Sequence, residues 1–238
     1  FLLAQQDKVD EMMAYLHELR AKDDKRKKTL WLLEVKLLSL VQAKEKMMDI
    51  LNKAIIDFPE DDQLLYARAM NLDSQDDLEG MESDLRKILD HKPDNAIALN
   101  ALGYTLADKT GRYPEAFVLI QRAHILEPEN PAILDSLGWV LFKLNKKEEA
   151  LLYLLKAFQG YQDGEVAAHL GEVLWSLNQR TEALEVWLNV LNKFPEHPVL
   201  LETIKRLAPE SLEKKPINEE LNSSNEDNDN SKVDSETP

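Results

Sequence analysis

The 238-residue chain has no cysteine, only seven glycines and no long apolar run. The absence of cysteine excludes disulfides and thiolate metal sites. A helix that spans a membrane needs about 20 largely apolar residues in succession, so the short apolar runs here exclude one. Because glycine is scarce while Leu, Ala, Glu and Lys are abundant, the composition favours helix over sheet. We therefore expect an all-α protein.

Basic residues are also in short supply, with 29 Lys and Arg against 44 Asp and Glu, for a net charge of −15. A field of this sign repels polyanions, so we expect no nucleic-acid partner. Residues 209–238 hold nine acidic residues and three lysines, a net −6, which leaves −9 for the first 208 residues. This last segment is rich in Asn, Ser and acidic residues and lacks aromatics, which predicts a disordered acidic tail.

Small residues and prolines recur with a period of about 34 residues, which is typical of several helix-turn-helix repeats. Each alanine of the series follows its glycine at nearly the same interval, which is one residue longer in the first case than in the other two. One proline of the series is missing, and Gln162 occupies its position. The markers are Gly103, Gly138 and Gly171; Ala116, Ala150 and Ala183; and Pro59, Pro93, Pro128 and Pro195.

Each marker has a physical role in a pair of antiparallel helices. The glycine and the alanine lie where the two helices cross closely, and a larger side chain there would clash. The proline ends the second helix because it has no N–H and disfavours helix in the residue before it. Asx and Glu residues beside the prolines are expected to cap the next helix.

These markers divide the chain into an N-terminal part, 1–61, a repeat array with a capping helix, 62–208, and the tail, 209–238. The N-terminal part is expected to contain a helix at 2–20 and a degenerate repeat at 28–61. We expect eleven or twelve helices in all. The repeats of the array are predicted at 62–95, 96–130, 131–163 and 164–197, followed by a capping helix at 198–207.

The pattern resembles the tetratricopeptide-repeat family, through Leu-Gly-Tyr at 102–104, Ala116, Ala123, Pro128 and their counterparts in the following repeats. The resemblance covers residues 62–197 well and 28–61 weakly. It implies a right-handed superhelix, an α-solenoid of about five repeats with capping helices at both ends, and a role in binding proteins.

A closer resemblance lies in residues 65–69, 100–108, 134–140 and 167–175, which are similar to proteobacterial outer-membrane lipoproteins with tetratricopeptide repeats. The best-understood members are adaptors that present cell-wall hydrolases to a periplasmic carboxyl-terminal processing protease. The resemblance implies that role, that protease and its substrates as partners, and a periplasmic location. It also implies a lipid-anchored cysteine upstream of Phe1, so the membrane is reached only through that anchor.

The family resemblance also implies a binding groove along the first helix of each repeat, at repeat positions 2, 5, 9, 12 and 13. Aromatic residues there, with a few polar groups, are typical of a peptide-binding surface. An Asn in the groove is expected to hold an extended peptide by its backbone amides. The alternative is that the aromatics pack between repeats, as we expect for Trp31 and Trp187. The candidate groove residues are Tyr66, Asn100, Tyr104, Asp135, Trp139, Phe142, Glu172 and Trp175.

Other features point to no catalysis and no cofactor. No nucleophile motif, P-loop or dinucleotide loop occurs, so we expect no enzyme activity. His169 and Glu172 are three residues apart, but a single such pair does not make a metal site. The basic run at 22–28 is interpreted as a solvated turn, with contact to anionic lipid as the alternative. The Met-rich helix at 2–20 either packs on the degenerate repeat or docks a partner helix.

Two further functions stay open beside the protease adaptor. One is a general scaffold or assembly factor in cell-envelope biogenesis, and the other is a cytosolic co-chaperone, which would be cytoplasmic. Co-chaperone repeats grip acidic C-termini with a groove cluster of Lys and Arg. The equivalent positions here are aromatic, Asn, Asp and Glu, which argues against the co-chaperone.

Overall fold

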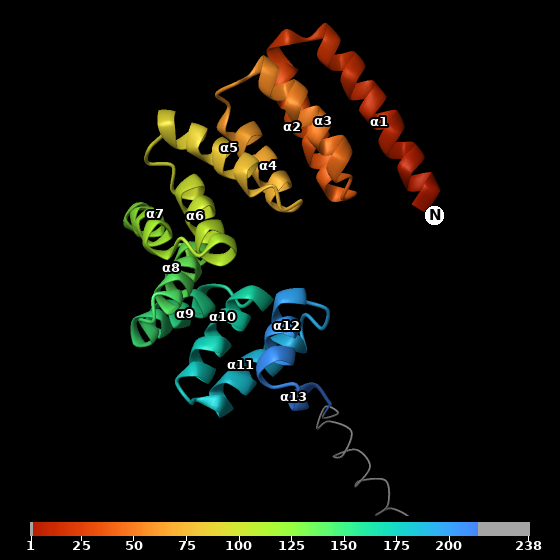
Figure 1. The fold of residues 1–238 in the computed structure, drawn as a ribbon. Helices are drawn as coiled ribbons and strands as arrows, with labels where there is room; N and C mark the ends of the chain where they lie inside the picture. Colours follow the sequence, from red (N-terminus) through yellow and green to blue (C-terminus); the bar gives the residue numbers. More distant parts are fainter. Residues whose placement is uncertain (1, 214–238) are drawn as a thin grey trace, which may run out of the picture. The chain divides into compact units, whose positions relative to one another are not determined.

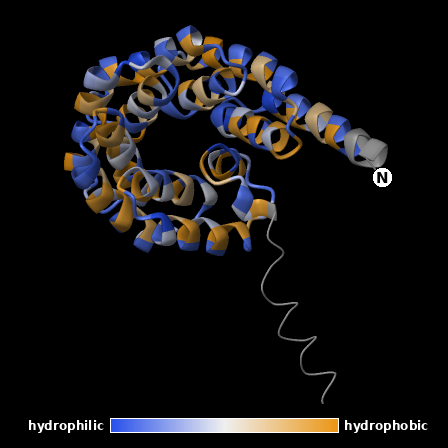
Figure 2. Cartoon of the chain, turned by 60° about the horizontal axis from the view of Figure 1, so that its bottom comes forward, coloured by the Kyte–Doolittle hydropathy of each residue, from blue (hydrophilic) through white to orange (hydrophobic). Residues whose placement is uncertain are grey.

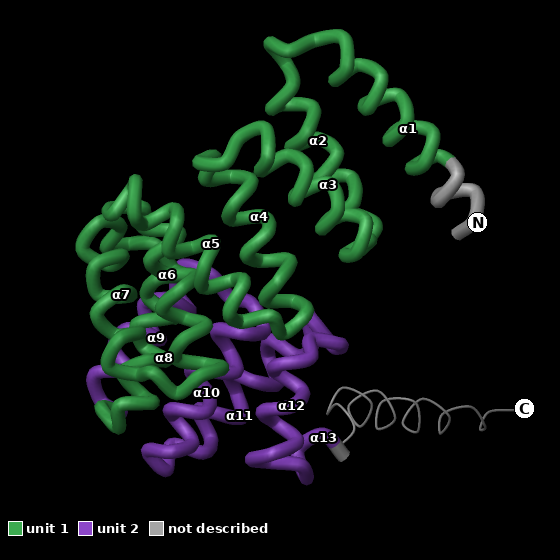
Figure 3. Tube along the Cα trace, turned by 45° about the horizontal axis from the view of Figure 1, so that its top comes forward, with its two compact units in different colours: residues 1–146 green, residues 147–238 purple. Residues whose placement is uncertain are grey.

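The computed structural model describes residues 2–213 (Figure 1), and these residues form α-helices and turns without any strand. The chain divides into two compact units, residues 1–146 and residues 147–238 (Figure 3). Apolar and polar residues are interspersed along the helices (Figure 2). Every helix in residues 2–213 is too short or too polar to cross a bilayer. The expected all-α fold is confirmed.

Unit 1 is a series of helices in which each helix packs against the next. In addition, the first helices of neighbouring hairpins meet, α2 with α4 and α6 with α8. A π-helical turn at Leu106–Thr110 continues α6. The helices are α1 Leu2–Lys22, α2 Lys27–Leu40, α3 Lys44–Asp57, α4 Asp62–Asp73, α5 Leu78–His91, α6 Ala96–Thr105, α7 Tyr113–Leu126 and α8 Pro131–Lys143.

Unit 2 is built around α10, which packs against α9, α11 and α12. The predicted capping helix at 198–207 coincides with α12, and α13 adds one turn within the predicted tail. The structure thus describes thirteen α-helices in residues 2–213, more than the eleven or twelve expected. The helices of unit 2 are α9 Lys147–Gly160, α10 Gly164–Ser176, α11 Arg180–Leu191, α12 Pro198–Leu207 and α13 Glu210–Glu213.

Four helices begin shortly after a marker proline, as the sequence predicted. In each case the residue two positions after the proline is the N-cap, and its side chain accepts a hydrogen bond from a backbone N–H of the first turn. This contact satisfies an N–H that has no partner inside the helix. The caps are Asp61, Asn95, Asn130 and His197, after Pro59, Pro93, Pro128 and Pro195.

One residue with left-handed backbone ends the first helix of each of five hairpins. These residues recur with the repeat period, so the degenerate repeat at 28–61 has the same turn as the others. In four of the turns the next N–H donates to the carbonyl five residues before it, at 2.9–3.0 Å. This is the Schellman termination of a helix. The five residues and their φ angles are Gln42 (55°), Asp76 (59°), Gly111 (72°), Asn145 (62°) and Asn178 (63°).

The hairpin that contains Gly111 has one residue more than its neighbours. Arg112 N–H donates to the carbonyl of Leu106, six residues before it, at 3.2 Å. The sequence signal of this insertion is the interval from Gly103 to Ala116, which is one residue longer than the corresponding interval in the next two repeats. An inserted residue inside a helix produces a π-helical turn, and such turns are frequent at functional sites.

Two of the glycine markers, Gly103 and Gly171, lie at close helix crossings. A Cβ at Gly103 would be 2.6 Å from Ile120 Cγ1 of α7, and one at Gly171 would be 2.0 Å from Trp187 Nε1 of α11. Trp187 is fully buried in unit 2. Glycine is therefore required where α6 meets α7 and where α10 meets α11.

Helix α1 is attached to unit 1 through a buried ion pair. The Arg20 guanidinium pairs with the Glu34 carboxylate on α2 and lies 3.2 Å from the centroid of the Trp31 ring. The Trp31 indole is buried and donates to Asp57 Oδ2 at 2.9 Å. The packing role expected for Trp31 and Trp187 is confirmed by their burial.

The compact units do not follow the segments predicted from the sequence. Residues 1–61 lie inside unit 1, and the predicted repeat 131–163 contributes one helix to each unit. Of the predicted tail, residues 210–213 form α13, while 214–238 lie outside the described residues. The repeat periodicity fixes the hairpins, but it carries no information on where contacts between hairpins become sparse.

Candidate functional site

Five of the six predicted groove residues of unit 1 lie on two helices that pack together, α6 and α8, and the sixth, Tyr66, lies on α4. Asn100 and Tyr104 are one helical turn apart on α6, and Asp135 and Trp139 are one turn apart on α8. Residues four apart share a face of a helix. The structure therefore places the four side chains in two pairs, each on one face of its helix.

Trp139 is more enclosed than an open groove would leave it. The residue is 5% exposed, and its Nε1–H donates to Asp108 Oδ1 in the π-helical turn at 3.2 Å. The Phe142 ring centroid is 5.5 Å from that of Trp139, and Lys143 Nζ lies 4.0 Å from the ring centroid. This burial is what packing between repeats requires, while Tyr104 and Phe142 remain half-buried.

Asn100 carries the most informative polar atom on this face. Its Oδ1 is inaccessible to solvent and has no hydrogen-bond partner among the described residues. A buried acceptor without a donor costs about 1–3 kcal/mol. Asn100 as a whole is half-buried, so a rotation of its side chain beside Tyr104 would bring this oxygen to the surface, where it could accept a backbone N–H from an incoming peptide.

In unit 2 the two predicted residues already have partners. Glu172 on α10 accepts a hydrogen bond from Arg206 Nη2 on the capping helix α12. The ring centroids of Trp175 and Trp187 are 5.7 Å apart, and the Arg180 guanidinium carbon is 4.9 Å from the Trp175 ring centroid. Trp175 is half-buried, so one part of its ring stays accessible.

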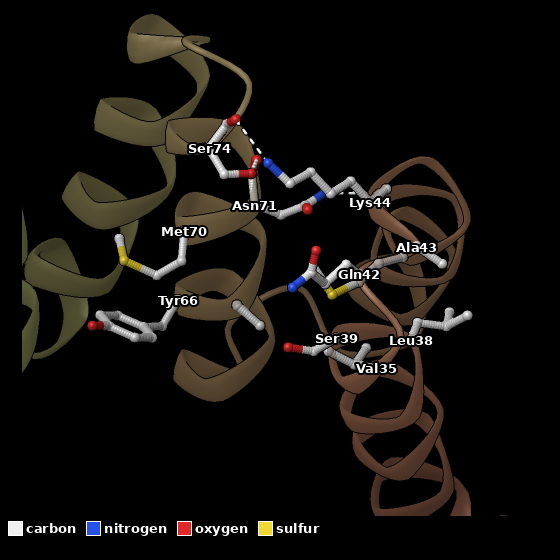
Figure 4. Close-up of a pocket in the computed structure, with 12 residues that line it drawn as sticks. Val35, Leu38, Ser39, Gln42, Ala43, Lys44, Tyr66, Met70, Asn71 and Ser74 are labelled. Carbon is white, nitrogen blue, oxygen red and sulfur yellow. Dashed lines mark hydrogen bonds between the residues drawn. The ribbon is translucent and has the colours of Figure 1, made fainter. Parts of the chain in front are cut away.

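Tyr66 belongs to a pocket that the sequence did not reveal. The pocket has a volume of about 430 Å³ and lies between α4 and the α2–α3 hairpin (Figure 4). The apolar part of its wall includes Val35, Leu38, Met47 and Met70, and burial raises the pKa of the Tyr66 hydroxyl.

The polar part of the same wall includes Ser39, Gln42 and Lys44 on the side of the α2–α3 hairpin, and Asn71 and Ser74 on the side of α4. Figure 4 shows the Asn71 side chain extending from α4 toward the α2–α3 turn. Asn71 Nδ2 donates to the carbonyl of Lys44 at 3.2 Å, but Asn71 Oδ1 is buried without a partner among the described residues. Asn71 lies at no expected groove position, and the sequence signal for this region is Tyr66, which is one of the candidate groove residues.

The histidine–glutamate pair and the basic run noted in the sequence form no metal or ligand site among the described residues. In residues 2–213 no three His, Asp or Glu side chains are grouped so as to bind a metal ion. The basic run is occupied by internal ion pairs, Lys27 with Asp57 at 2.8 Å and Lys28 with Asp61 at 2.5 Å. The interpretation of this run as a turn agrees with the short 3₁₀ helix at Asp24–Arg26.

Comparison with known proteins identifies the repeat. The sequence model described as "Tetratricopeptide repeat" matches residues 132–163. A TPR repeat-containing protein of Pseudomonas aeruginosa is 47% identical over 206 residues, which is 87% of this chain. The aligned region covers 35% of that relative, so this chain spans about a third of its length.

Solved structures show the same fold at low sequence identity. A thermophilic TPR protein of Thermus thermophilus superposes with a TM-score of 0.64 at 18% identity, covering 79% of this chain and 100% of the other. PilF of Pseudomonas aeruginosa superposes with a TM-score of 0.58 at 20% identity, covering 83% and 97%. With the matched repeat and the five equivalent turns, these likenesses show that the chain has the helical-repeat fold of tetratricopeptide-repeat proteins.

Proposed function

We propose that this chain is a protein-binding adaptor that holds an extended segment of a partner on the α6–α8 face of unit 1. The observation that carries the proposal is the buried Asn100 Oδ1 without a partner, one turn from Tyr104. A strand of a partner protein supplies N–H donors at regular intervals, which is what this acceptor lacks.

We further propose that the partners are a periplasmic carboxyl-terminal processing protease and its cell-wall hydrolase substrates. What supports this is the resemblance of residues 65–69, 100–108, 134–140 and 167–175 to lipoprotein adaptors of that kind. A periplasmic location at the outer membrane follows from the same resemblance. A scaffold in cell-envelope biogenesis that binds other proteins is the second candidate, since it needs the same face.

The test combines capture with stability, because Asn100→Ala should move the two in opposite directions. Removing an unsatisfied buried amide should leave the urea midpoint unchanged or raised. Loss of the hydrogen bond to a partner should weaken its retention roughly tenfold, as expected for about 1.5 kcal/mol. The immobilised chain is incubated with bacterial envelope extract, and bound proteins are quantified by mass spectrometry.

The control is Lys36→Ala on the exposed surface of α2. Co-elution of a serine protease with cell-wall hydrolases, reduced by Asn100→Ala and not by Lys36→Ala, supports the adaptor. Capture of other envelope proteins with the same dependence on Asn100 favours the general scaffold. If Asn100→Ala retains the partners as well as the wild type does, the proposed site on the α6–α8 face is wrong.

A further inference from the structure

A second binding feature of unit 1 is the pocket between α4 and the α2–α3 hairpin, which is separate from the α6–α8 face. Its volume of about 430 Å³ lies in the range of roughly 300–1,000 Å³ typical of ligand pockets. The wall is largely apolar, with a small number of amide and hydroxyl groups (Figure 4). This combination is typical of sites that bind an apolar group and orient it by hydrogen bonds.

Several polar groups of the wall are bonded within the fold, but one buried acceptor is not. Asn71 is 2% exposed, and its Oδ1 has no donor among the described residues. The orientation of the Asn71 amide is set by the hydrogen bond from Nδ2 to the Lys44 carbonyl. A flipped amide would place Oδ1 against that carbonyl oxygen, and two acceptors repel each other. Asn71 Oδ1 is therefore an acceptor that an N–H donor of a ligand could satisfy.

Gln42 contributes a second polar group at a conformational cost. Its φ of 55° is left-handed, which costs a residue with a Cβ about 1–2 kcal/mol. The equivalent turn positions carry Asp, Gly and Asn, which accept this backbone more readily. The Gln42 side chain is exposed at the pocket, so it can turn aside and open a path for a ligand toward Asn71.

We propose that this pocket binds an apolar side chain of an extended peptide, such as Leu, Met or Phe, while a neighbouring backbone N–H donates to Asn71 Oδ1. The ligand is uncharged at this point, because the one charged residue of the wall, Lys44, already donates from its ammonium group to the Ser74 carbonyl at 3.1 Å. The inference rests on the proposed peptide-binding function and extends it to a second, chemically defined contact. Met47 and Met70 supply adaptable apolar surface against the bound side chain.

The test uses the whole chain labelled with ¹³C-methyl methionine and 5-fluorotryptophan. The probe is acetyl-Gly-Ser-Leu-Ser-Gly-amide, titrated in parallel with a Leu-to-Ala peptide and a peptide N-methylated at Leu and at the following Ser. The Met47 and Met70 methyl resonances should shift, while that of Met81, buried elsewhere in unit 1, should not. The Ala peptide and the N-methylated peptide should each bind at least tenfold more weakly.

Two variants of α2 provide the matched control. Ser39→Phe fills the pocket from an exposed position and should abolish the methionine shifts. Lys36→Phe adds the same ring outside the pocket and should leave them unchanged. Asn71→Ala should bind the N-methylated and unmethylated peptides equally, with helical circular dichroism as the check on folding.

The outcomes separate this inference from the proposed function. The inference is wrong if the Met47 and Met70 resonances still shift in the Ser39→Phe variant, or if they shift equally with the N-methylated and the unmethylated peptide. A shift of the Trp139 fluorine resonance without methionine shifts overturns it as well, but leaves the α6–α8 face as the peptide site. No shift in either place means that water alone fills the pocket, which also overturns the inference, and the capture experiment then decides the proposed function separately.

Discussion

Individual residues of this repeat protein serve both the fold and its surface. Gln42, Asp76, Asn145 and Asn178 each end a helix with left-handed backbone. Asn and Asp tolerate that conformation because their short polar side chains bond locally, whereas Gln gains no such relief. Gln42 is also the one among them that lines the pocket beside Asn71. Strained backbone that persists is often found at binding sites, which is consistent with the proposed ligand contact.

A contact within the α4–α5 hairpin should make stability depend on pH. His91 Nε2 at the end of α5 lies 2.7 Å from Asp62 Oδ1 at the start of α4, and this hydrogen bond raises the pKa of His91. A raised pKa means that the folded state favours the protonated ring. The contribution is therefore complete below the unfolded pKa of about 6.5 and is lost as the pH rises through the folded pKa.

The variant His91→Gln should accordingly lower the thermal midpoint more at pH 5.5 than at pH 8.5. Thermal melts followed by circular dichroism at several pH values measure the difference. In an Asp62→Asn background the same substitution should show no such pH dependence. An equal loss at both pH values would contradict the role of the ion pair.

At the scale of elements, α1 depends on charge as much as on apolar packing. Glu34 is 1% exposed, and its buried carboxylate is paired with Arg20 of α1. Removing one partner of a buried pair leaves an uncompensated charge and costs about 3–5 kcal/mol. Arg20→Ala should therefore release α1, and limited proteolysis should cut within residues 2–22 much faster than in the wild type.

A double variant distinguishes charge from shape in that contact. Arg20→Met with Glu34→Leu removes both charges while keeping similar volume, and such replacements of buried pairs are often neutral or stabilising. The double variant should resist the protease like the wild type. Equal sensitivity of the single and double variants would show that packing against Trp31, rather than the charge, holds the helix.

The sequence predicts these elements well where one residue decides a boundary. Proline and the cap two residues after it place the start of four helices, and the small residues place the helix crossings. The π-helical turn is harder, because the longer interval from Gly103 to Ala116 is equally compatible with a longer loop. Only the hydrogen bond from Arg112 to Leu106 distinguishes the two.

The candidate sites show the same limit. Helical periodicity is sufficient to pair Asn100 with Tyr104 and Asp135 with Trp139. Periodicity does not predict that Phe142 and Lys143 cover the Trp139 ring, because this contact depends on the side-chain conformations of the next turn of α8. The pocket at Asn71 depends on side chains from α2, α3 and α4 that are far apart in the sequence, and their packing is invisible to a periodic pattern.

At the scale of the whole molecule, contacts are predominantly between helices that are near in sequence, as in repeat proteins generally. Stability in such proteins is approximately a sum of repeat and neighbour contributions. A change in one unit should then be felt mainly in that unit. Trp31 in unit 1 and Trp187 in unit 2 are buried reporters of the two parts.

The substitution Gly171→Ala tests this localisation. The new Cβ would be 2.0 Å from Trp187 Nε1, and the buried indole has little room to move. Overpacking of this kind costs about 1–3 kcal/mol. In urea titrations followed by ¹⁹F resonances of 5-fluorotryptophan, the Trp187 midpoint should fall while the Trp31 midpoint moves much less. Adding Trp187→Phe removes the clashing atom together with this reporter, so the expected recovery of part of the loss is followed at Trp175, which also lies in unit 2. Equal shifts at both reporters would instead mean that the two units unfold as one cooperative body, because a clash confined to α10 and α11 would then destabilise every repeat alike.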